Sequence, residues 1–168
     1  DNDAFLRIIN YPARGIGQTS LDRLKIAADS MNCSLFDAAS SDSLSQFGIK
    51  SSTSSTLSDF CAFIRACSVE LYNEDAFTLG KKIIKRSRLK ETISEEDKAE
   101  NKDRVENVEE LISGLQSFVS LEDNSLIDEL TGEVVSLENR TLDVYLQQIS
   151  LFSDIDTKDD DKEAVSLM

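Results

Sequence analysis

The chain contains no histidine and no tryptophan, and it has a single proline among 168 residues. Without histidine, catalytic triads and histidine acid–base chemistry are excluded, and we find no other residue set that supports catalysis. The cysteines Cys33, Cys61 and Cys67 lack the paired spacing of a metal site. Because Cys61 and Cys67 share one apolar helical stretch, we expect buried thiols in a reducing cytoplasm. We therefore expect no metal site and no enzyme activity in the chain itself.

Long apolar runs are also missing. None is long enough to span a bilayer, and the start lacks the basic-then-apolar pattern of a signal segment. We therefore expect a cytoplasmic protein with no membrane partner. Period-two alternation is missing too, whereas apolar residues recur at helical spacing along most of the chain. With 168 residues, a hydrophobic fraction of 40% and only six glycines, the sequence predicts an all-α globular domain.

Positive charge is scarce, because 18 Lys and Arg residues face 32 Asp and Glu residues, for a net charge of −14. The imbalance is local. Residues 1–93 hold 12 basic and 11 acidic residues (+1), whereas residues 94–168 hold 6 and 21 (−15), and the two parts sum to −14. One run of ten residues carries six cations and no acid: Lys81, Lys82, Lys85, Arg86, Arg88 and Lys90. Taken alone, this basic run fits a solvated helix face as well as a phosphate-contacting patch.

A pair of glycines follows the single proline, in the segment Tyr-Pro-Ala-Arg-Gly-Ile-Gly-Gln-Thr-Ser-Leu over residues 11–21. This segment predicts a helix end, a tight loop, and the start of a second helix capped by Thr19 or Ser20. The unpaired N–H groups at the start of that helix then face the loop. Such a loop is suited to an anion, and Arg14 adds a positive charge. The predicted phosphate-binding residues are Arg14, Gly15, Ile16, Gly17 and Thr19. A plain turn between helices is the alternative.

A second helix–turn–helix is predicted around Phe47-Gly48-Ile49-Lys50. With a phosphate-binding loop in the same chain, the basic run is better interpreted as part of a DNA contact than as a solvated face. We therefore expect five of its cations on the same side as Arg14, namely Lys81, Lys82, Lys85, Arg86 and Arg88. The acidic residues expected to point away from that side are Glu95, Glu96, Glu109 and Glu110. The secondary DNA contacts predicted on these grounds are Lys50, Lys85, Arg86 and Arg88.

Helical periodicity and capping patterns place the remaining elements. They predict a first helix over 5–9, a second marked by Leu21, Leu24 and Ala28, a short one opened by Ser34-x-x-Asp37, and helices over 57–71 and 75–86. A long helix is predicted to be capped by Ser94, and a final helix to start near Thr141. The core face of the long helix is predicted to consist of Val105, Val108, Leu111, Ile112, Leu115 and Phe118.

Three blocks, ordered along the chain, resemble one family. They are residues 1–10 with Pro-Ala-Arg-Gly-Ile-Gly at 12–17, Asp-Arg-Val-Glu-Asn-Val-Glu-Glu-Leu at 103–111, and Leu-Phe-Ser-Asp-Ile-Asp at 151–156 with Ala-Val-Ser-Leu-Met at 164–168. The first resembles the start of the 2B accessory domain of UvrD/PcrA/Rep-type superfamily 1 DNA helicases. The second resembles that family's Arg-x-Glu-Asn-x-x-Glu-Leu helix, and the third resembles the approach to helicase motif V.

This resemblance implies an irregular helical 2B-type domain with helix–hairpin–helix-like loops over 1–152, containing an insertion over 120–140. It also implies an acidic tail over 153–168 that leads toward the 2A motor domain. In the family, 2B grips duplex DNA ahead of the fork, and the Gly-Ile-Gly loop is one of its contacts. The implied partners are double-stranded DNA at a junction with single strand and the motor domains of the same polypeptide.

The ATPase of such a 3′-to-5′ helicase, acting in DNA repair or replication, lies in its motor domains. ATP and Mg are therefore expected for the parent protein, and no cofactor for this fragment. Gly80-Lys81 is not a nucleotide-binding loop, because the upstream glycine and the following Ser or Thr are missing. The sequence Ser87-Arg88-Leu89 departs from the small residue, Gly, and Tyr or Leu that commonly form another turn in the family, which puts backbone–phosphate contact there in doubt.

Two other interpretations stay open at this point. The chain is also compatible with a helical protein-interaction module whose acidic C-terminal half binds a basic partner. A third interpretation keeps the helicase family but makes the parent a recombination nuclease subunit that contains the equivalent domain.

Overall fold

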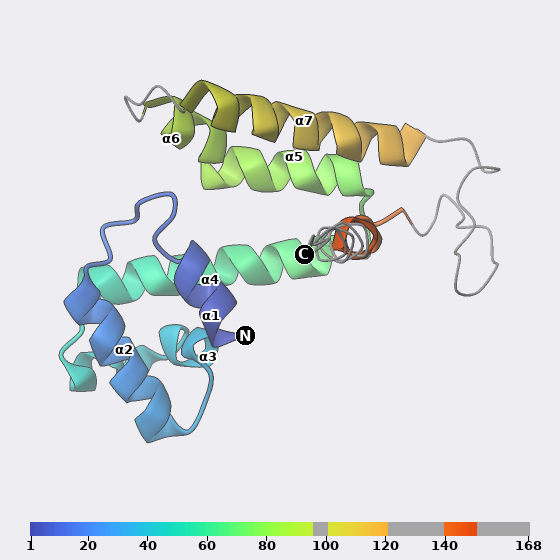
Figure 1. Cartoon of the computed structure of the whole chain (residues 1–168). Helices are drawn as coiled ribbons and strands as arrows, with labels where there is room; N and C mark the ends of the chain where they lie inside the picture. Colours follow the sequence, from blue (N-terminus) through green and yellow to red (C-terminus); the bar gives the residue numbers. More distant parts are fainter. Residues whose placement is uncertain (96–100, 121–139, 151–168) are drawn as a thin grey trace, which may run out of the picture. The chain divides into compact units, whose positions relative to one another are not determined.

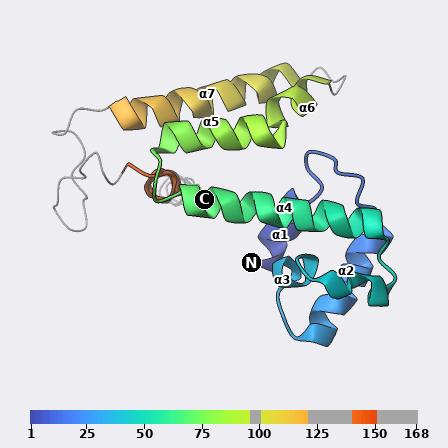
Figure 2. The same ribbon diagram turned by 180° about the vertical axis from the view of Figure 1, so that it is seen from behind.

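A computed structural model describes residues 1–95, 101–120 and 140–150 of the chain. Its elements are α1 (Asn2–Ile8), α2 (Gln18–Met31), α3 (Leu35–Ala39), the 3₁₀ helix η1 (Asp42–Phe47), α4 (Ser51–Glu70), α5 (Ala76–Ser87), α6 (Leu89–Glu95), α7 (Asn101–Ser120) and a helix over 142–150 (Figures 1 and 2). No strand occurs within these ranges, which confirms the predicted all-α class. None of the described helices is long and apolar enough to cross a membrane.

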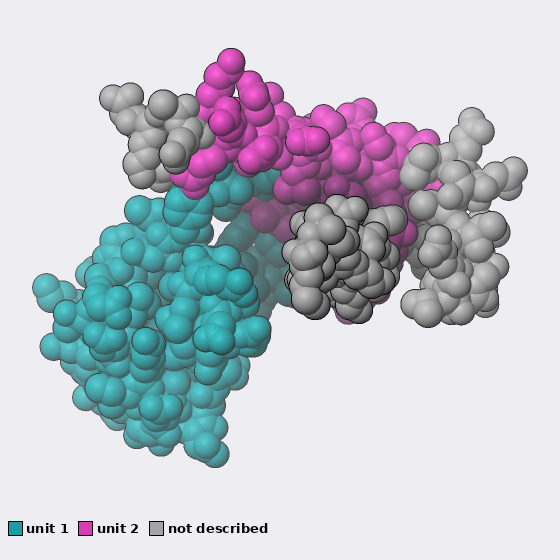
Figure 3. Space-filling view, viewed as in Figure 1, with its two compact units in different colours: residues 1–69, 84–98 teal, residues 70–83, 99–168 magenta. Residues whose placement is uncertain are grey.

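The chain divides into two compact units, coloured separately in Figure 3. The first unit comprises residues 1–69 and 84–98, and the second comprises residues 70–83 and 99–168. The predicted insertion over 120–140 falls, apart from its end residues, outside the described part of the chain. The predicted tail over 153–168 lies wholly outside it.

The core of the first unit is built from α1, α2, α3, η1 and α4. Phe5 lies at its centre, edge-on to the rings of Phe36 and Phe60 at centroid distances of 6.3 and 6.0 Å. Leu24 of α2 and Leu57 of α4 are completely buried beside them. The predicted cap of α3 is confirmed, since the Oγ of Ser34 accepts the N–H of Asp37 at 3.1 Å.

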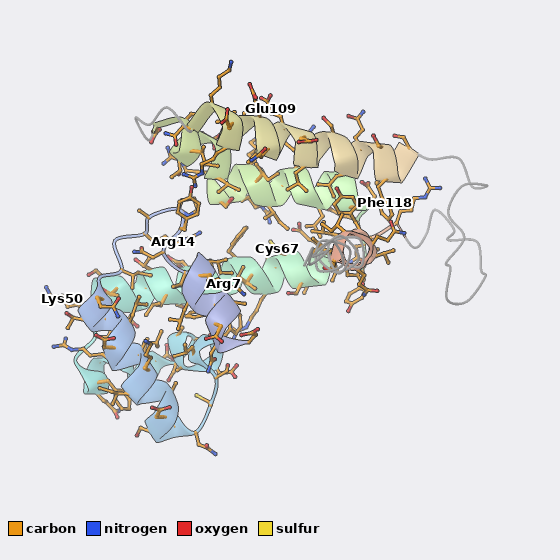
Figure 4. All side chains as sticks on the ribbon, viewed as in Figure 1. Arg7, Arg14, Lys50, Cys67, Glu109 and Phe118 are labelled. Carbon is orange, nitrogen blue, oxygen red and sulfur yellow. The ribbon has the colours of Figure 1, made fainter. Side chains whose placement is uncertain are left out.

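The second unit has a smaller core, in which Ala76 of α5 packs with Leu115 and Phe118 of α7. Tyr145 closes it, with its ring 5.3 Å from that of Phe118. Arg140 is almost fully buried, and its Nη1 donates to the carbonyl of Val119 at 2.7 Å. Figure 4 shows Glu109 and Phe118 at different positions along α7.

Three sequence predictions about these elements are wrong. Ser94 does not cap the long helix, because it lies in the last turn of the separate helix α6, where its Oγ donates to the carbonyl of Lys90 at 2.9 Å. Leu111 was expected in the core but is 39% exposed. The third concerns Cys67, which was expected to be buried but is only partly buried. Cys61 is fully buried as predicted, and burial raises the pKa of its thiol.

Candidate nucleic-acid interface

The loop over residues 10–17 is organised by Asn10, a residue that the sequence analysis did not single out. The Oδ1 of Asn10 accepts the N–H of Arg14 at 2.9 Å and that of Ile16 at 3.3 Å. Its Nδ2 donates to the carbonyl of Ile16 at 3.1 Å. The Asn10 side chain therefore binds both backbone polar groups of Ile16, its N–H and its carbonyl. The available signal was weak: an Asn close before Pro and Gly, where Asn side chains often bond nearby backbone.

Within this loop the three residues of the Gly-Ile-Gly segment have different tasks. Gly15 has a φ of +72°, a conformation that L side chains rarely adopt. Ile16 is 2% exposed and anchors the loop in the core of the first unit. Because the N–H of Ile16 is bonded to Asn10, this predicted phosphate-binding residue acts through its buried side chain here. Gly15 and Gly17 are exposed at the surface.

The helix start after the loop differs from the prediction. The N-cap of α2 is Gly17, with φ −74° and ψ 161°, and no side chain caps the helix. Thr19 and Ser20 are already inside the first turn, so the predicted cap by either of them is wrong. The N–H groups of Ser20 and Leu21 bond to the carbonyl of Gly17, at 2.9 and 3.2 Å. A glycine cap offers no side-chain oxygen, so the first N–H groups of α2 stay uncapped.

The N–H groups of Gln18 and Thr19 have no hydrogen-bond partner among the described residues. Both residues are exposed, and no acidic residue occupies the first turn of α2. Aligned peptide dipoles place partial positive charge at this end of a helix. The combination of free donors, missing acids and exposed surface is suited to an anion.

Arg14 is turned inward rather than extended toward solvent. Its Nη1 donates to the carbonyls of Ile8, Ile9 and Pro12, at 3.0, 3.0 and 3.1 Å. Its guanidinium carbon lies 4.6 Å from the ring centroid of Phe60. Burial lowers the pKa of Arg14 from its ordinary value. Arg14 thus closes the C-terminal end of α1 and braces the loop, and its side chain is half-buried.

The predicted second turn is present between η1 and α4. Gly48 ends η1 with a φ of +74°, and Ile49 after it is 3% exposed. Lys50 is exposed and directly precedes α4, with its carbonyl accepting the N–H of Ser54 at 2.9 Å. Figure 4 shows the Lys50 side chain directed away from the helices. Both turns therefore consist of a glycine with positive φ, a buried isoleucine and an exposed residue before a helix.

Part of the predicted basic run shares a groove with Arg14. This groove, within the first unit, has a volume of about 670 Å³, and its lining includes Arg14, Phe60, Arg86 and Arg88. Lys85 is exposed but does not line it. Glu95, which we expected to face elsewhere, also lines the groove and pairs with Arg88 at 3.8 Å, so that expectation is wrong.

Two cations of the basic run, Lys81 and Lys82, belong to the second unit and have partners there. Lys82 forms ion pairs with Glu74 and with Glu70, the latter at 3.8 Å. The Nζ of Lys81 lies 4.8 Å from the ring centroid of Phe77. The charge of Lys82 is thus balanced by two carboxylates, and the charge of Lys81 lies against an aromatic ring. The six cations of the basic run therefore differ in their surroundings.

Curated relatives align with the chain from end to end. The ATP-dependent DNA helicase PcrA of Leuconostoc citreum is 30% identical over 175 residues, covering 100% of this chain and 21% of that protein. PcrA from Bacillus subtilis and from Staphylococcus aureus strain Mu50 are each 26% identical, over 174 and 168 residues, with the same coverage. The chain corresponds to a fragment of a PcrA/UvrD-type helicase. This confirms the resemblance found in the sequence.

The chain spans 21% of the length of these relatives. No protein-family model matches it. The relationship therefore rests on identity that extends along the whole chain.

Proposed function

We propose that this chain is the 2B-type accessory domain of its parent helicase and binds duplex DNA through backbone phosphates. The observation that carries the proposal is the exposed start of α2, where Gln18 and Thr19 offer unpaired N–H groups beside Gly17. Phosphate oxygens accept hydrogen bonds from such N–H groups. The end-to-end relation to PcrA helicases supports DNA as the source of these phosphates.

The second turn extends this contact. Lys50 adds an exposed cation before α4, whose first turn also lacks acidic residues. The two turns form a pair of helix–hairpin–helix-like contacts, and Arg86, Arg88 and Lys85 supply further positive charge. Because all these groups address phosphates and none is placed to read base edges, binding is independent of sequence.

The proposal divides the work of the parent protein. ATP and Mg act in motor domains of the same polypeptide, which drive 3′-to-5′ unwinding in repair or replication. This domain holds the duplex at its junction with single strand and regulates that activity. The calculated net charge of −14 implies that the isolated chain binds weakly, because most of its surface charge repels DNA.

A titration of a labelled duplex with the chain tests the proposal. We expect a dissociation constant on the order of 10⁻⁴ M or weaker at physiological salt, tightening as salt is lowered and equal for unrelated duplex sequences. A matched titration with a basic peptide in place of the duplex tests the alternative in which the chain is a protein-interaction module. Binding of the peptide without any duplex binding at low salt would favour that alternative and contradict our proposal.

A further inference from the structure

Arg23 connects α2 to the second turn. Its Nη1 donates to the carbonyl of Gly48, 25 residues further along the chain. Its guanidinium carbon and Nη1 lie 3.4 Å from the position that a Cβ on Gly48 would occupy. The guanidinium therefore lies against the only face of Gly48 from which a side chain could extend. Neither this contact nor a role for Arg23 follows from the sequence pattern.

This contact holds the turn at its most demanding residue. Gly48 has a φ of +74°, and its carbonyl belongs to the peptide that leads into the buried Ile49 and then Lys50. Fixing that peptide fixes where the chain enters α4, and so where Lys50 emerges. The turn is also held by backbone bonds from the N–H groups of Gly48 and Ile49 to η1 carbonyls, at 3.0 and 3.3 Å, and by the Ile49 side chain, which is buried in the core of the first unit. Arg23 adds a polar side-chain contact from another helix to the carbonyl side of Gly48.

The same helix also begins at the first loop. The N-cap of α2 is Gly17, and Arg23 lies in its second turn. A single rigid helix thus carries the free N–H groups of one turn and the side chain that holds the other. The two turns are therefore linked directly by the first part of α2, from Gly17 to Arg23, and not only by the chain that runs through α2, α3 and η1.

We propose that Arg23 is a positioning residue of the DNA interface, which fixes the second turn so that Lys50 meets the duplex already held by the first. This inference rests on the proposed function. A positioning role differs from a direct phosphate contact by Arg23 in a measurable way. If Arg23 acts through Lys50, its removal has no further effect once Lys50 is gone.

The test is a double-mutant cycle in the chain, with duplex affinity measured at several salt concentrations. Arg23→Met keeps an unbranched side chain without the guanidinium, and Lys50→Ala removes the cation. We expect each single variant to weaken binding about three- to fivefold and the double variant to be no weaker than Lys50→Ala. The slope of log affinity against log salt should fall by about 1 in either single variant and no further in the double.

Arg65→Met is the matched control. Arg65 also lies in the first unit, donates to the Oγ of Ser40 at 2.9 Å and has its guanidinium 5.1 Å from the Phe36 ring centroid, but touches neither turn. Its affinity for duplex should equal that of the unchanged chain. If Arg23→Met fails to fold, Arg23→Gln replaces it, because the shorter, neutral amide also takes the guanidinium away from the Gly48 carbonyl and keeps a polar side chain at this exposed position.

Each other outcome overturns the inference. Additive losses with two successive drops in salt slope would make Arg23 a direct contact. No effect of Arg23→Met, or none of Lys50→Ala, would show that nothing at this turn is being positioned. These results differ from failure of the proposed function, in which the unchanged chain itself shows no duplex binding at low salt.

Discussion

Alanine at the two loop glycines should separate the stability of the fold from DNA binding. Gly15 and Gly17 are both exposed, and a Cβ on either would meet no atom within 4 Å. Sterically the two substitutions are therefore equal. They differ in backbone conformation, since Gly15 has a φ of +72° and Gly17 a φ of −74°.

The conformational difference sets the expected free energies. A residue with a Cβ in the left-handed region is strained by about 1–2 kcal/mol, of which the reduced entropy of the unfolded chain offsets about 0.4–1 kcal/mol. Gly15→Ala should therefore lower the free energy of unfolding by about 1 kcal/mol, or the melting temperature by about 2–4 °C for a chain of this size. For Gly17→Ala, the entropic gain and the poorer N-cap nearly cancel, leaving about 0.5 kcal/mol or less.

Denaturant unfolding and duplex titration of both variants give the assay. Gly17→Ala should unfold like the unchanged chain yet bind duplex more weakly, because its methyl group stands where a phosphate would approach Gln18 and Thr19. Gly15→Asn serves as the control, since Asn tolerates positive φ better than Ala and should recover part of the lost stability. Equal stability of Gly15→Ala and the unchanged chain would refute the strain argument. Unchanged duplex affinity of Gly17→Ala would show that the loop is only a turn.

Three further predictions concern substitutions of single residues. Asn10→Ala removes three hydrogen bonds and should lower the free energy of unfolding by about 2 kcal/mol in a denaturant titration; an unchanged midpoint would contradict its role in the loop. Gly80→Ala should destabilise by about 1 kcal/mol, because its Cβ would lie 2.5 Å from Cδ1 of the buried Leu115, which outweighs the gain in helix propensity. Although burial opposes it, hydrogen bonds from Thr78 lower the pKa of Asp75 below 3.8. The stabilisation by Asp75 is thus complete above pH 3.8 and lost as pH falls through the lowered value, and Asp75→Asn should flatten this acid limb of the stability curve.

The helices were largely predictable because their signals are local. Periodic apolar residues place α2, α4 and α5, and the Ser34 side chain caps α3 as its spacing indicates. The turn at Gly48 was predictable for the same reason, since a glycine between two helical patterns indicates a residue with positive φ. Each of these signals is complete within a few residues.

Errors arose where several local solutions compete. Thr19 and Ser20 are both good capping residues, but Gly17 already adopts the extended conformation of an N-cap, so the helix starts two or three residues earlier than the hydroxyls suggest. Ser94 likewise precedes acidic residues, yet α6 extends through it. Leu111 follows the apolar period of α7, but the smaller core of the second unit does not extend over it. Choosing among caps or faces requires the tertiary packing, which periodicity does not contain.

The candidate site shows the same limit in its chemistry. An arginine beside a glycine loop predicts a positive charge available to bind phosphate. Instead, the Nη1 of Arg14 donates to three backbone carbonyls, and its guanidinium lies over the Phe60 ring. Its bonds to the Ile8 and Ile9 carbonyls close the end of α1, and its bond to the Pro12 carbonyl holds the loop. An arginine is suited to this because one planar group can serve several acceptors. The surface left for the phosphate is then mostly backbone, at Gly17 and the first residues of α2. That is why the glycines, and not the arginine, carry the sharpest test of DNA binding in this loop.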